Sequence, residues 1–307
     1  MVNAADTPNT TTENTDIPTF ALGGDLDVRR VGFGAMRLAA GTFGGPARDP
    51  EDGMAVLRRA VELGVNHIDT AGFYGVGEVR ANSMIREALT PYQDDLVIAT
   101  KVGPMVDDSG VPRFEAAPDQ LRGLVEAELR ALALERLDLV YLRVGGTAGP
   151  GGAPVAERFA VLAALQQEGL IRHLGVSNVD LEQFEEARTV APIAAVQNHF
   201  HVQHQVAATL LGRCAELGIA FVPYFPIGGG FQPLDSPGVL KVAARLDATP
   251  AQVAQAWLLA ISPNMLLIPG TGSLEHLEEN VAAGALRLSA EDFADLADDS
   301  TRDATAH

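Results

Sequence analysis

The chain has 307 residues, of which 47% are hydrophobic and 20% charged, so it has enough apolar side chains for a packed core and is not a mainly disordered protein. The formal net charge of -18 would repel a phosphate backbone, which argues against a nucleic acid as a partner. No stretch approaches the roughly 20 consecutive apolar residues of a membrane span, and the N-terminus lacks the basic-then-apolar order of a signal peptide, so we expect no membrane partner and a cytoplasmic location.

The N-terminal part of the chain divides into a tail and a hairpin. Residues 1–17 are polar, rich in Thr and Asn and without a period, which predicts a disordered tail in front of a single domain over residues 18–307. Two short extended runs within residues 20–28 lie on either side of Gly23 and Gly24. This pattern predicts a short N-terminal hairpin that closes one end of the domain.

Beyond the hairpin, short apolar runs alternate with longer helical patterns. The runs predict eight strands, at residues 31–36, 65–69, 96–100, 137–142, 171–176, 193–197, 219–223 and 265–269. They are nearly continuous apolar runs, as expected for parallel strands covered on both sides. A Rossmann fold would need a glycine-rich turn that opens a helix after the first strand, but a long loop follows there. The pattern therefore predicts an α/β fold of the closed (β/α)8 TIM-barrel type.

Three polar side chains follow the second and third predicted strands. Asp69 stands at the tip of the second strand, Tyr74 in the loop after it, and Lys101 at the tip of the third. The active site of a barrel is built at the C-terminal ends of its strands, so these side chains emerge at one rim. A phenol ionises at about pH 10, and a neighbouring cation favours its phenolate form. Lys101, oriented by Asp69, would let Tyr74 protonate a developing alkoxide; the alternative is a rim ion pair beside a loop aromatic.

A run of motifs extends beyond these three residues. The segment GVNHIDTAGFYGVGEVRANSMIREAL is followed in order by IATKVG, LGVSN, AAVQN, PYFP and IPGTGSLEHLEEN. In these motifs the chain resembles the aldo-keto reductase family over residues 20–298, nearly its whole length. The resemblance implies a (β/α)8 barrel, NADP(H) bound in an extended form across the rim, and a catalytic set of Asp, Tyr, Lys and His. The first three members of that set match Asp69, Tyr74 and Lys101.

The fourth member of the catalytic set differs from the family pattern. Family members usually carry His at the end of the fourth strand, whereas this chain has Arg143. Arginine is a permanent cation with five donors, so it can polarise a carbonyl oxygen or bind a carboxylate but cannot shuttle a proton. We expect Arg143 to position the substrate; the alternative is that it turns aside and pairs with an acid at the rim.

The resemblance also implies a cofactor site. A nicotinamide requires an aromatic platform and polar partners for its carboxamide, and the glycine-rich loops after the seventh and eighth strands suit phosphates. The residues that match the family's cofactor positions are Met36, Arg37, Asp69, Ser177, Asn178, Gln197, Tyr224, Pro226, Ile227, Gly228, Gly270, Thr271, Gly272, His276, Glu279 and Asn280. Gly270 and His276 stand where family members often place Lys and Arg against the 2′-phosphate, so NADP(H) is the expected cofactor while NAD(H) stays open.

Two further groups of side chains lie near the predicted mouth of the barrel. An apolar substrate pocket would be walled by Phe73, Phe225 and Phe231. A spacing that can bind a metal occurs in His199, His201 and His204. Acids that would complete such a site are not evident nearby, so we expect polar rim residues and no metal.

Three functions agree with this pattern. The first is reduction of a small aldehyde or ketone by hydride transfer from NADPH, with Tyr74 as proton donor, in a monomer or small homo-oligomer. The second is a nicotinamide-binding regulatory protein in which the altered fourth residue has removed most turnover. The third is reduction of an activated carbon–carbon double bond, which also couples hydride and proton delivery. Because Asp69, Tyr74 and Lys101 are all present, we favour the first.

Overall fold

The computed structural model describes residues 18–41, 45–106, 112–145, 149–230 and 232–303. The tail predicted for residues 1–17 and the predicted pocket residue Phe231 lie outside the described residues and stay predictions. Among the helices of the described ranges, none combines the length and the apolar character that crossing a membrane requires.

A parallel sheet forms the centre of the molecule. Its strands follow one another in chain order: β3 (Phe33–Gly34), β4 (His67–Asp69), β7 (Val97–Val102), β10 (Leu137–Arg143), β11 (Ile171–Ser177), β12 (Ala195–His199) and β13 (Ala220–Tyr224). The eighth predicted strand joins the two edges of this sheet, since Met265 forms a parallel bridge with Phe221 and Leu267 forms one with Val31. The fold is therefore a (β/α)8 barrel, as the alternation of apolar runs predicted.

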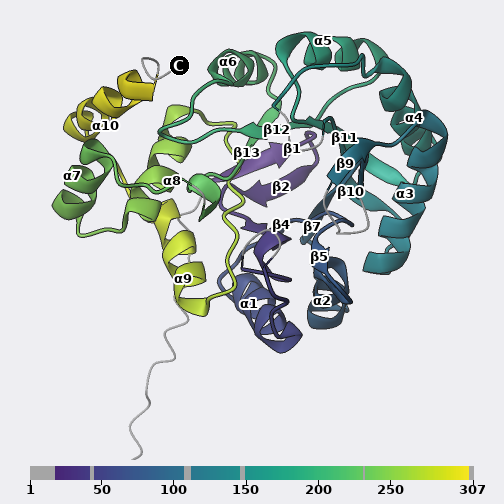
Figure 1. Ribbon diagram of the computed structural model, residues 1–307, viewed down its shortest axis with the longest axis horizontal. Coiled ribbons are helices and arrows are strands. Elements are labelled where there is room, and N and C mark those ends of the chain that lie inside the picture. The colour runs from purple at the N-terminus through teal and green to yellow at the C-terminus, as the bar shows by residue number, and fades with distance from the viewer. Residues whose placement is uncertain (1–17, 42–44, 107–111, 146–148, 231, 304–307) are drawn as a thin grey trace, which may run out of the picture.

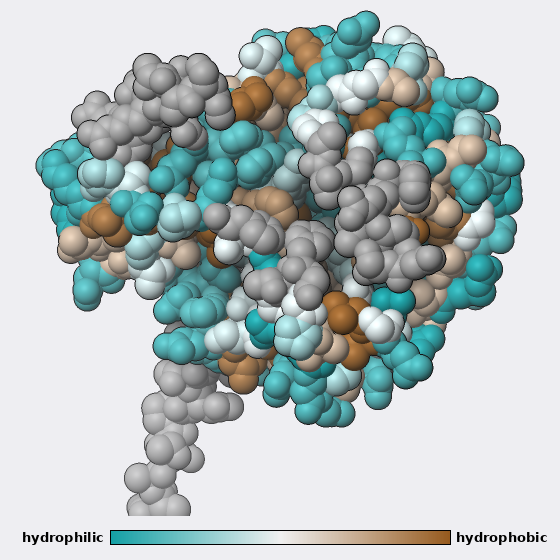
Figure 2. Space-filling model, in the orientation of Figure 1, coloured by the Kyte–Doolittle hydropathy of each residue, from teal (hydrophilic) through white to brown (hydrophobic). Residues whose placement is uncertain are grey.

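Helices cover the outside of the barrel (Figure 1). They are α1 (Pro50–Glu62), α2 (Ala81–Leu89), α3 (Pro118–Leu132), α4 (Ala156–Gln167), α5 (Leu181–Val190), α6 (Ala208–Glu216), α7 (Pro237–Leu246), α8 (Pro250–Ile261), α9 (Leu274–Ala282) and α10 (Ala290–Asp303), with 3-10 turns η1 (Ala35–Arg37), η2 (Gly228–Gly230) and η3 (Ala283–Ala285). Hydrophilic residues dominate the outer edge of the face in Figure 2. The helices thus bury their apolar sides against the strands and present polar sides to water.

Capping side chains set the start of two helices. The N–H of Gln183 donates to Asp180 Oδ1 at 2.8 Å, and the N–H of Asp180 donates to Gln183 Oε1 at 3.3 Å. The same reciprocal pair links Thr249 and Gln252 at the start of α8. Because each pair satisfies backbone groups that a helix end leaves open, the first turns of α5 and α8 are well defined.

The predicted N-terminal hairpin is confirmed and covers one opening of the barrel. Strands β1 (Thr19–Leu22) and β2 (Leu26–Arg29) pair antiparallel, and Gly23 and Gly24 have φ values of 64° and 89°, a region that favours glycine. Leu22 and Val28 are fully buried, within a cluster of inward-facing strand residues that includes Tyr141. The hairpin therefore closes the N-terminal end of the barrel.

Two small hairpins extend the loops at the opposite end of the barrel. β5 (Gly75–Val76) pairs with β6 (Val79–Arg80) after strand β4, and β8 (Pro104–Val106) pairs with β9 (Pro112–Glu115) after strand β7. They follow the strands that carry Asp69 and Lys101, so they form part of the wall around the C-terminal opening.

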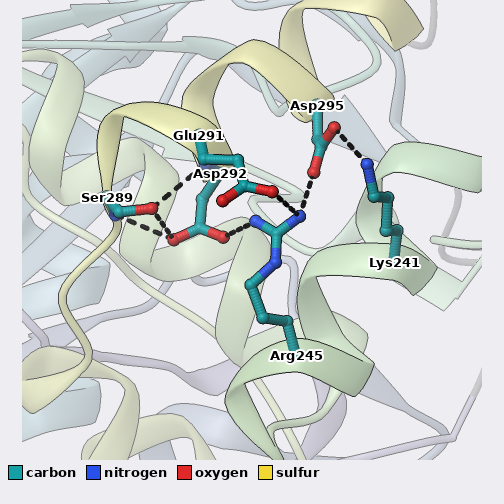
Figure 3. A network of polar contacts seen from close by, with 6 residues as sticks. All are labelled: Lys241, Arg245, Ser289, Glu291, Asp292 and Asp295. Carbon is teal, nitrogen blue, oxygen red and sulfur yellow. Dashed lines mark hydrogen bonds and ion pairs between the residues drawn. The ribbon is translucent and has the colours of Figure 1, made fainter.

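An ion-pair network ties the C-terminal helix α10 to α7 (Figure 3). The Arg245 guanidinium contacts Asp292 and Asp295 and lies 3.0 Å from Glu291 Oε1, while Lys241 Nζ lies 2.7 Å from Asp295 Oδ1. At the start of helix α10 the N–H of Asp292 donates to Ser289 Oγ at 3.2 Å. The network lies on the outer layer, so it serves packing of the two helices.

Candidate active site

A buried ion pair joins the tips of two neighbouring strands. Lys101 Nζ contacts Asp69 Oδ1, and both side chains are almost fully buried. Lys101 Nζ also donates to the carbonyl oxygen of Thr70 at 3.0 Å, and Gln197 Nε2 donates to Asp69 Oδ2 at 2.7 Å. Strands β4 and β7 are adjacent and parallel, which brings the acid and the amine to the same rim. The pair has several hydrogen bonds, as a buried charge pair requires.

Tyr74 lies beside this ion pair. A turn in which the Tyr74 N–H donates to the Ala71 oxygen at 2.9 Å brings the chain back over the barrel after β4. Lys101 Nζ then lies 5.0 Å from the centroid of the Tyr74 ring, and Phe73 packs edge-to-face on that ring with a centroid distance of 5.1 Å. Burial by itself would lower the pKa of the Lys101 ammonium, but Asp69 and the Tyr74 oxygen hold this pKa above its ordinary value. Lys101 is therefore a cation next to the phenol.

A second polar cluster stands at the ends of β10 and β13. Arg143 is the last residue of β10, and its guanidinium carbon lies 5.4 Å from the centroid of the Tyr224 ring. The Tyr224 hydroxyl donates to Asn178 Oδ1 at 2.9 Å, and Asn178 Nδ2 donates to the Val144 oxygen at 2.9 Å. Burial raises the pKa of Tyr224, and the Arg143 charge opposes that rise. The hydrogen bond anchors the Tyr224 hydroxyl to Asn178.

Both clusters open into one large cavity of about 1340 Å³ at the C-terminal end of the strands. The lining combines apolar side chains with a few polar groups, as in most small-molecule sites. Sequence-predicted residues among the lining are Met36, Arg37, Asp69, Phe73, Tyr74, Lys101, Arg143, Gln197, Tyr224, Phe225, Pro226, Ile227, Gly270, Thr271, Gly272 and His276. The predicted catalytic residues and most of the predicted cofactor residues are therefore brought together around one space.

Comparison with known proteins agrees with this geometry. Residues 30–298 match the model of the Aldo/keto reductase family. The chain belongs to this family. It is 49% identical over 277 residues to the pyridoxine 4-dehydrogenase of Escherichia coli strain K12. The matched region covers 89% of this chain and 95% of that protein.

Solved structures of aldo-keto reductases have the same fold. One from Klebsiella pneumoniae, in complex with NADPH, superimposes with a TM-score of 0.76 at 26% identity. The superposition covers 91% of this chain and 93% of the Klebsiella chain. A thermostable aldo-keto reductase in complex with the inhibitor epalrestat gives a TM-score of 0.77 at 29% identity and covers 92% and 99% of the two chains.

Some predicted cofactor residues of this aldo-keto reductase do not line the cavity. They are Ser177, Asn178, Gly228, Glu279 and Asn280. Ser177 is fully buried behind the rim, and its Oγ has no hydrogen-bond partner within the described part of the chain. Asn280 is buried, and its Oδ1 accepts from Gln255 Nε2 at 2.8 Å, so this side chain contributes to packing between α9 and α8.

Two of the three histidines of the HFHVQH segment, His199 and His204, form a stack of rings that includes Tyr224. The His199 ring lies 4.0 Å from the His204 ring and 5.3 Å from the Tyr224 ring between centroids, nearly parallel to each. The Nε2 atom of His201 lies 2.6 Å from Gln232 Oε1. Burial, with the neighbouring histidines, lowers the pKa of His199 to about 3. Within the described residues no group of three or more metal-ligating side chains is found, and His199 instead packs against Tyr224.

Sequence reasoning missed Arg48, which lies at the far end of the cavity. Its guanidinium packs on Gly272, where an added Cβ would come within 1.9 Å of an Arg48 nitrogen. Arg37 lies nearby, donating to the Gly41 oxygen at 2.6 Å and to the Gly229 oxygen. Burial lowers the pKa of Arg37, and the charge of Arg48 adds to this effect. The folded chain brings the two cations together. The sequence did not indicate this, because Arg48 ends a long loop that carries no recognisable pattern.

A buried carboxyl behind the ion pair was also missed. Glu128 of α3 is 5% exposed, and its Oε2 accepts from Thr100 Oγ1 at 2.5 Å and from Asn82 Nδ2 at 2.9 Å. Asn82 in turn accepts from Thr70 Oγ1 at 2.7 Å. Burial raises the pKa of the Glu128 carboxyl, and the two hydrogen bonds oppose this. An acid in the middle of an amphipathic helix gives no sequence signal that distinguishes it from a solvated one.

Proposed function

We propose that this aldo-keto reductase is an NADP(H)-dependent oxidoreductase that reduces an aldehyde or ketone to an alcohol, with Tyr74 as the proton donor. The observation that carries the proposal is the buried Asp69–Lys101 pair beside the Tyr74 ring on the wall of the cavity. Burying a charge pair carries a desolvation cost that its hydrogen bonds must offset, and buried ionisable groups with a specific charge partner are frequent at catalytic sites.

The residues present fit a nicotinamide dinucleotide. The Tyr224 ring on the wall of the cavity offers a flat stacking surface for the nicotinamide. At the far end of the cavity, Arg37 and Arg48 next to Gly272 would bind phosphate groups. The Klebsiella pneumoniae relative was solved with NADPH, which agrees with this assignment. Bound NADPH would supply the hydride that adds to the carbonyl carbon.

The chain's own residues would handle the proton. As the carbon–hydrogen bond forms, the carbonyl π electrons move onto oxygen, and the Tyr74 hydroxyl gives its proton to that oxygen. The Lys101 ammonium stabilises the phenolate left on Tyr74, and Asp69 keeps Lys101 charged and oriented. The product is an alcohol, and the reverse sequence would oxidise it.

We propose pyridoxal as the carbonyl substrate, with pyridoxine as the alcohol product. The relative from Escherichia coli, 49% identical, is named for oxidation of pyridoxine at position 4, and that reaction run backwards reduces an aromatic aldehyde. The cavity has an aromatic wall at Phe73 and apolar side chains at Val179 and Leu181, which suit a flat ring.

The test is fluorescence titration with NADPH and NADH, followed by turnover on pyridoxal, benzaldehyde, a ketone and an enone. We expect NADPH binding and NADPH oxidation that depends on the aldehyde. NADPH binding without any turnover would instead favour a regulatory protein, and turnover of the enone alone would favour reduction of a carbon–carbon double bond. A chain that binds neither nucleotide would overturn the proposal.

A further inference from the structure

The cavity is cationic although the chain is strongly acidic. The formal net charge of the chain is -18. Among the described residues that line the cavity, the cations are Arg37, Arg48, Lys101 and Arg143, and the acids are Asp69 and Asp180. Asp69 contacts Lys101, and Asp180 Oδ1 accepts the N–H of Gln183 in the first turn of α5. This charge balance selects anionic ligands, because opposite charges attract most strongly inside a cavity.

The cations fall into two groups at different parts of the cavity. Arg37 and Arg48 lie against the glycines at 41, 229 and 272, on the loops expected to hold phosphates. Arg143 lies at the end of β10, in register with Ser177 of β11, and near the Tyr224 ring. Lys101 pairs in register with Tyr141, which stands two residues before Arg143 on the same strand. Since Lys101 lies beside the Tyr74 ring, Arg143 belongs to the end of the cavity that holds Tyr74. The phosphates of a dinucleotide account for the first group. Arg143 also interacts with Tyr224, and the guanidinium donors beyond that contact can face a substrate.

The shape of a guanidinium restricts what Arg143 can recognise there. Its planar fork presents parallel N–H donors that hold two oxygen atoms side by side, and it cannot accept a proton. An aromatic aldehyde with a hydroxyl on the adjacent ring carbon presents two such oxygens, and the hydroxyl ionises readily because the carbonyl withdraws electrons from the ring. The ionised oxygen and the carbonyl oxygen together match the fork and the charge.

We propose that Arg143 selects aromatic aldehydes that carry an ionisable hydroxyl adjacent to the carbonyl, by binding the ionised oxygen and the carbonyl oxygen together. This inference rests on the proposed function and gives its substrate class. Pyridoxal belongs to the class, since its hydroxyl is adjacent to its aldehyde. The carbonyl oxygen then lies between Arg143 and Tyr74, which leaves proton donation to Tyr74 and polarisation to Arg143.

A matched series of aldehydes tests this specificity. We expect kcat/KM for 2-hydroxybenzaldehyde to exceed that for 4-hydroxybenzaldehyde and 2-methoxybenzaldehyde by about tenfold or more. In Arg143→Gln the preference should fall below about threefold, while 2-methoxybenzaldehyde, which has no anionic oxygen, should lose much less. Arg143→Lys keeps the charge without the fork and should retain only part of the preference, and Arg143→His should also lose it.

A second readout does not depend on turnover. In the presence of NADP+, which cannot donate a hydride, the absorption spectrum of bound 2-hydroxybenzaldehyde reports whether its hydroxyl is ionised. We expect the pH midpoint of this ionisation to lie about one pH unit or more below that of the free aldehyde, and to return towards the free value in Arg143→Gln.

The outcomes separate the two proposals. Equal turnover of the three aldehydes, with an unchanged ionisation midpoint on binding, overturns the role of Arg143 and leaves the reductase activity standing. A chain that reduces none of the aldehydes and binds no nucleotide overturns both. A preference for 2-hydroxybenzaldehyde that Arg143→Gln leaves intact assigns the recognition to another side chain and overturns the inference.

Discussion

Lys101 Nζ lies 5.0 Å from the centroid of the Tyr74 ring and contacts the Asp69 carboxylate on its other side. A single ammonium group therefore connects a buried acid with a half-buried phenol at the edge of the cavity. This relationship makes Tyr74 the group whose removal should affect chemistry without affecting cofactor binding.

Tyr74→Phe should lower kcat for aldehyde reduction by about 10²- to 10⁴-fold, because the ring remains but the transferable proton is lost. The dissociation constant of NADPH should stay nearly unchanged, since in the proposed mechanism the hydroxyl acts on the substrate. Stopped-flow absorbance and fluorescence titration measure the two quantities. Unchanged turnover would remove Tyr74 from the mechanism.

Asp69→Asn should destabilise the fold by about 3–5 kcal/mol, because it leaves the Lys101 ammonium buried without its counter-ion. The free energy of unfolding in urea measures this loss. The matched control is the double variant Asp69→Asn/Lys101→Met, which removes both charges and should recover a large part of the stability while remaining inactive. A double variant as unstable as the single one would mean that the ion pair does not set the cost.

Glu128→Ala should reduce kcat without changing the dissociation constant of NADPH. Loss of the carboxyl leaves the Asn82 amide and the Thr100 hydroxyl buried without their acceptor, at a cost of about 1–3 kcal/mol, and loosens the Thr70 turn that precedes Tyr74. Glu128→Gln keeps the shape and one acceptor and should restore most of kcat. Steady-state kinetics with nucleotide titration distinguishes this positioning role from general instability, which would weaken binding as well.

Arg48→Gln should weaken NADPH binding by about tenfold and NADH binding by less than about twofold, if the guanidinium beside Gly272 binds the 2′-phosphate. Titration with 2′,5′-ADP and with 5′-AMP isolates the same difference without the nicotinamide. Arg37→Gln is the matched control, because Arg37 holds the Gly229 loop and should affect both nucleotides alike. Equal weakening of NADPH and NADH in Arg48→Gln would place Arg48 at the pyrophosphate instead.

Acid should destabilise the barrel through His67. This imidazole is fully buried without a hydrogen-bond partner for either nitrogen in the described residues, and burial lowers its pKa from 6.5 to about 4. Between these two pH values the unfolded chain binds a proton that the folded chain does not, so stability falls by about 3 kcal/mol as the pH drops through this window and levels off below it.

His67→Leu should flatten that part of the pH dependence. Urea unfolding at pH 7.5, 5.5 and about 4.5 measures the slope, which reports the difference in bound protons. The exposed His276, changed to Gln, is the control and should leave the slope as it is. An equally steep slope in His67→Leu would assign the acid sensitivity to other groups.

Local pattern was enough to predict the fold. Seven of the eight apolar runs contribute strands to the parallel sheet, the eighth joins its edges through two bridges, and the glycine hairpin forms as predicted. Each of these patterns reports burial or backbone geometry within a few neighbouring residues. The strand ends could also be placed, so Asp69 and Lys101 were expected at one rim. Arg143 was identified through the resemblance to the aldo-keto reductase family, as the residue that replaces the usual His at the end of the fourth strand.

Tertiary structure decided what lies around those residues. The segment at 265–268 closes the barrel only through bridges to Phe221 and Val31, and the hairpin's role as a cover depends on that closure. Glu128 and Arg48 reach the site from a helix and a loop that are distant in sequence, so no local period could report them. The positive charge of the cavity within an acidic chain is likewise a sum over side chains that meet only when the barrel closes, because charge adds by distance in space and not by order along the chain.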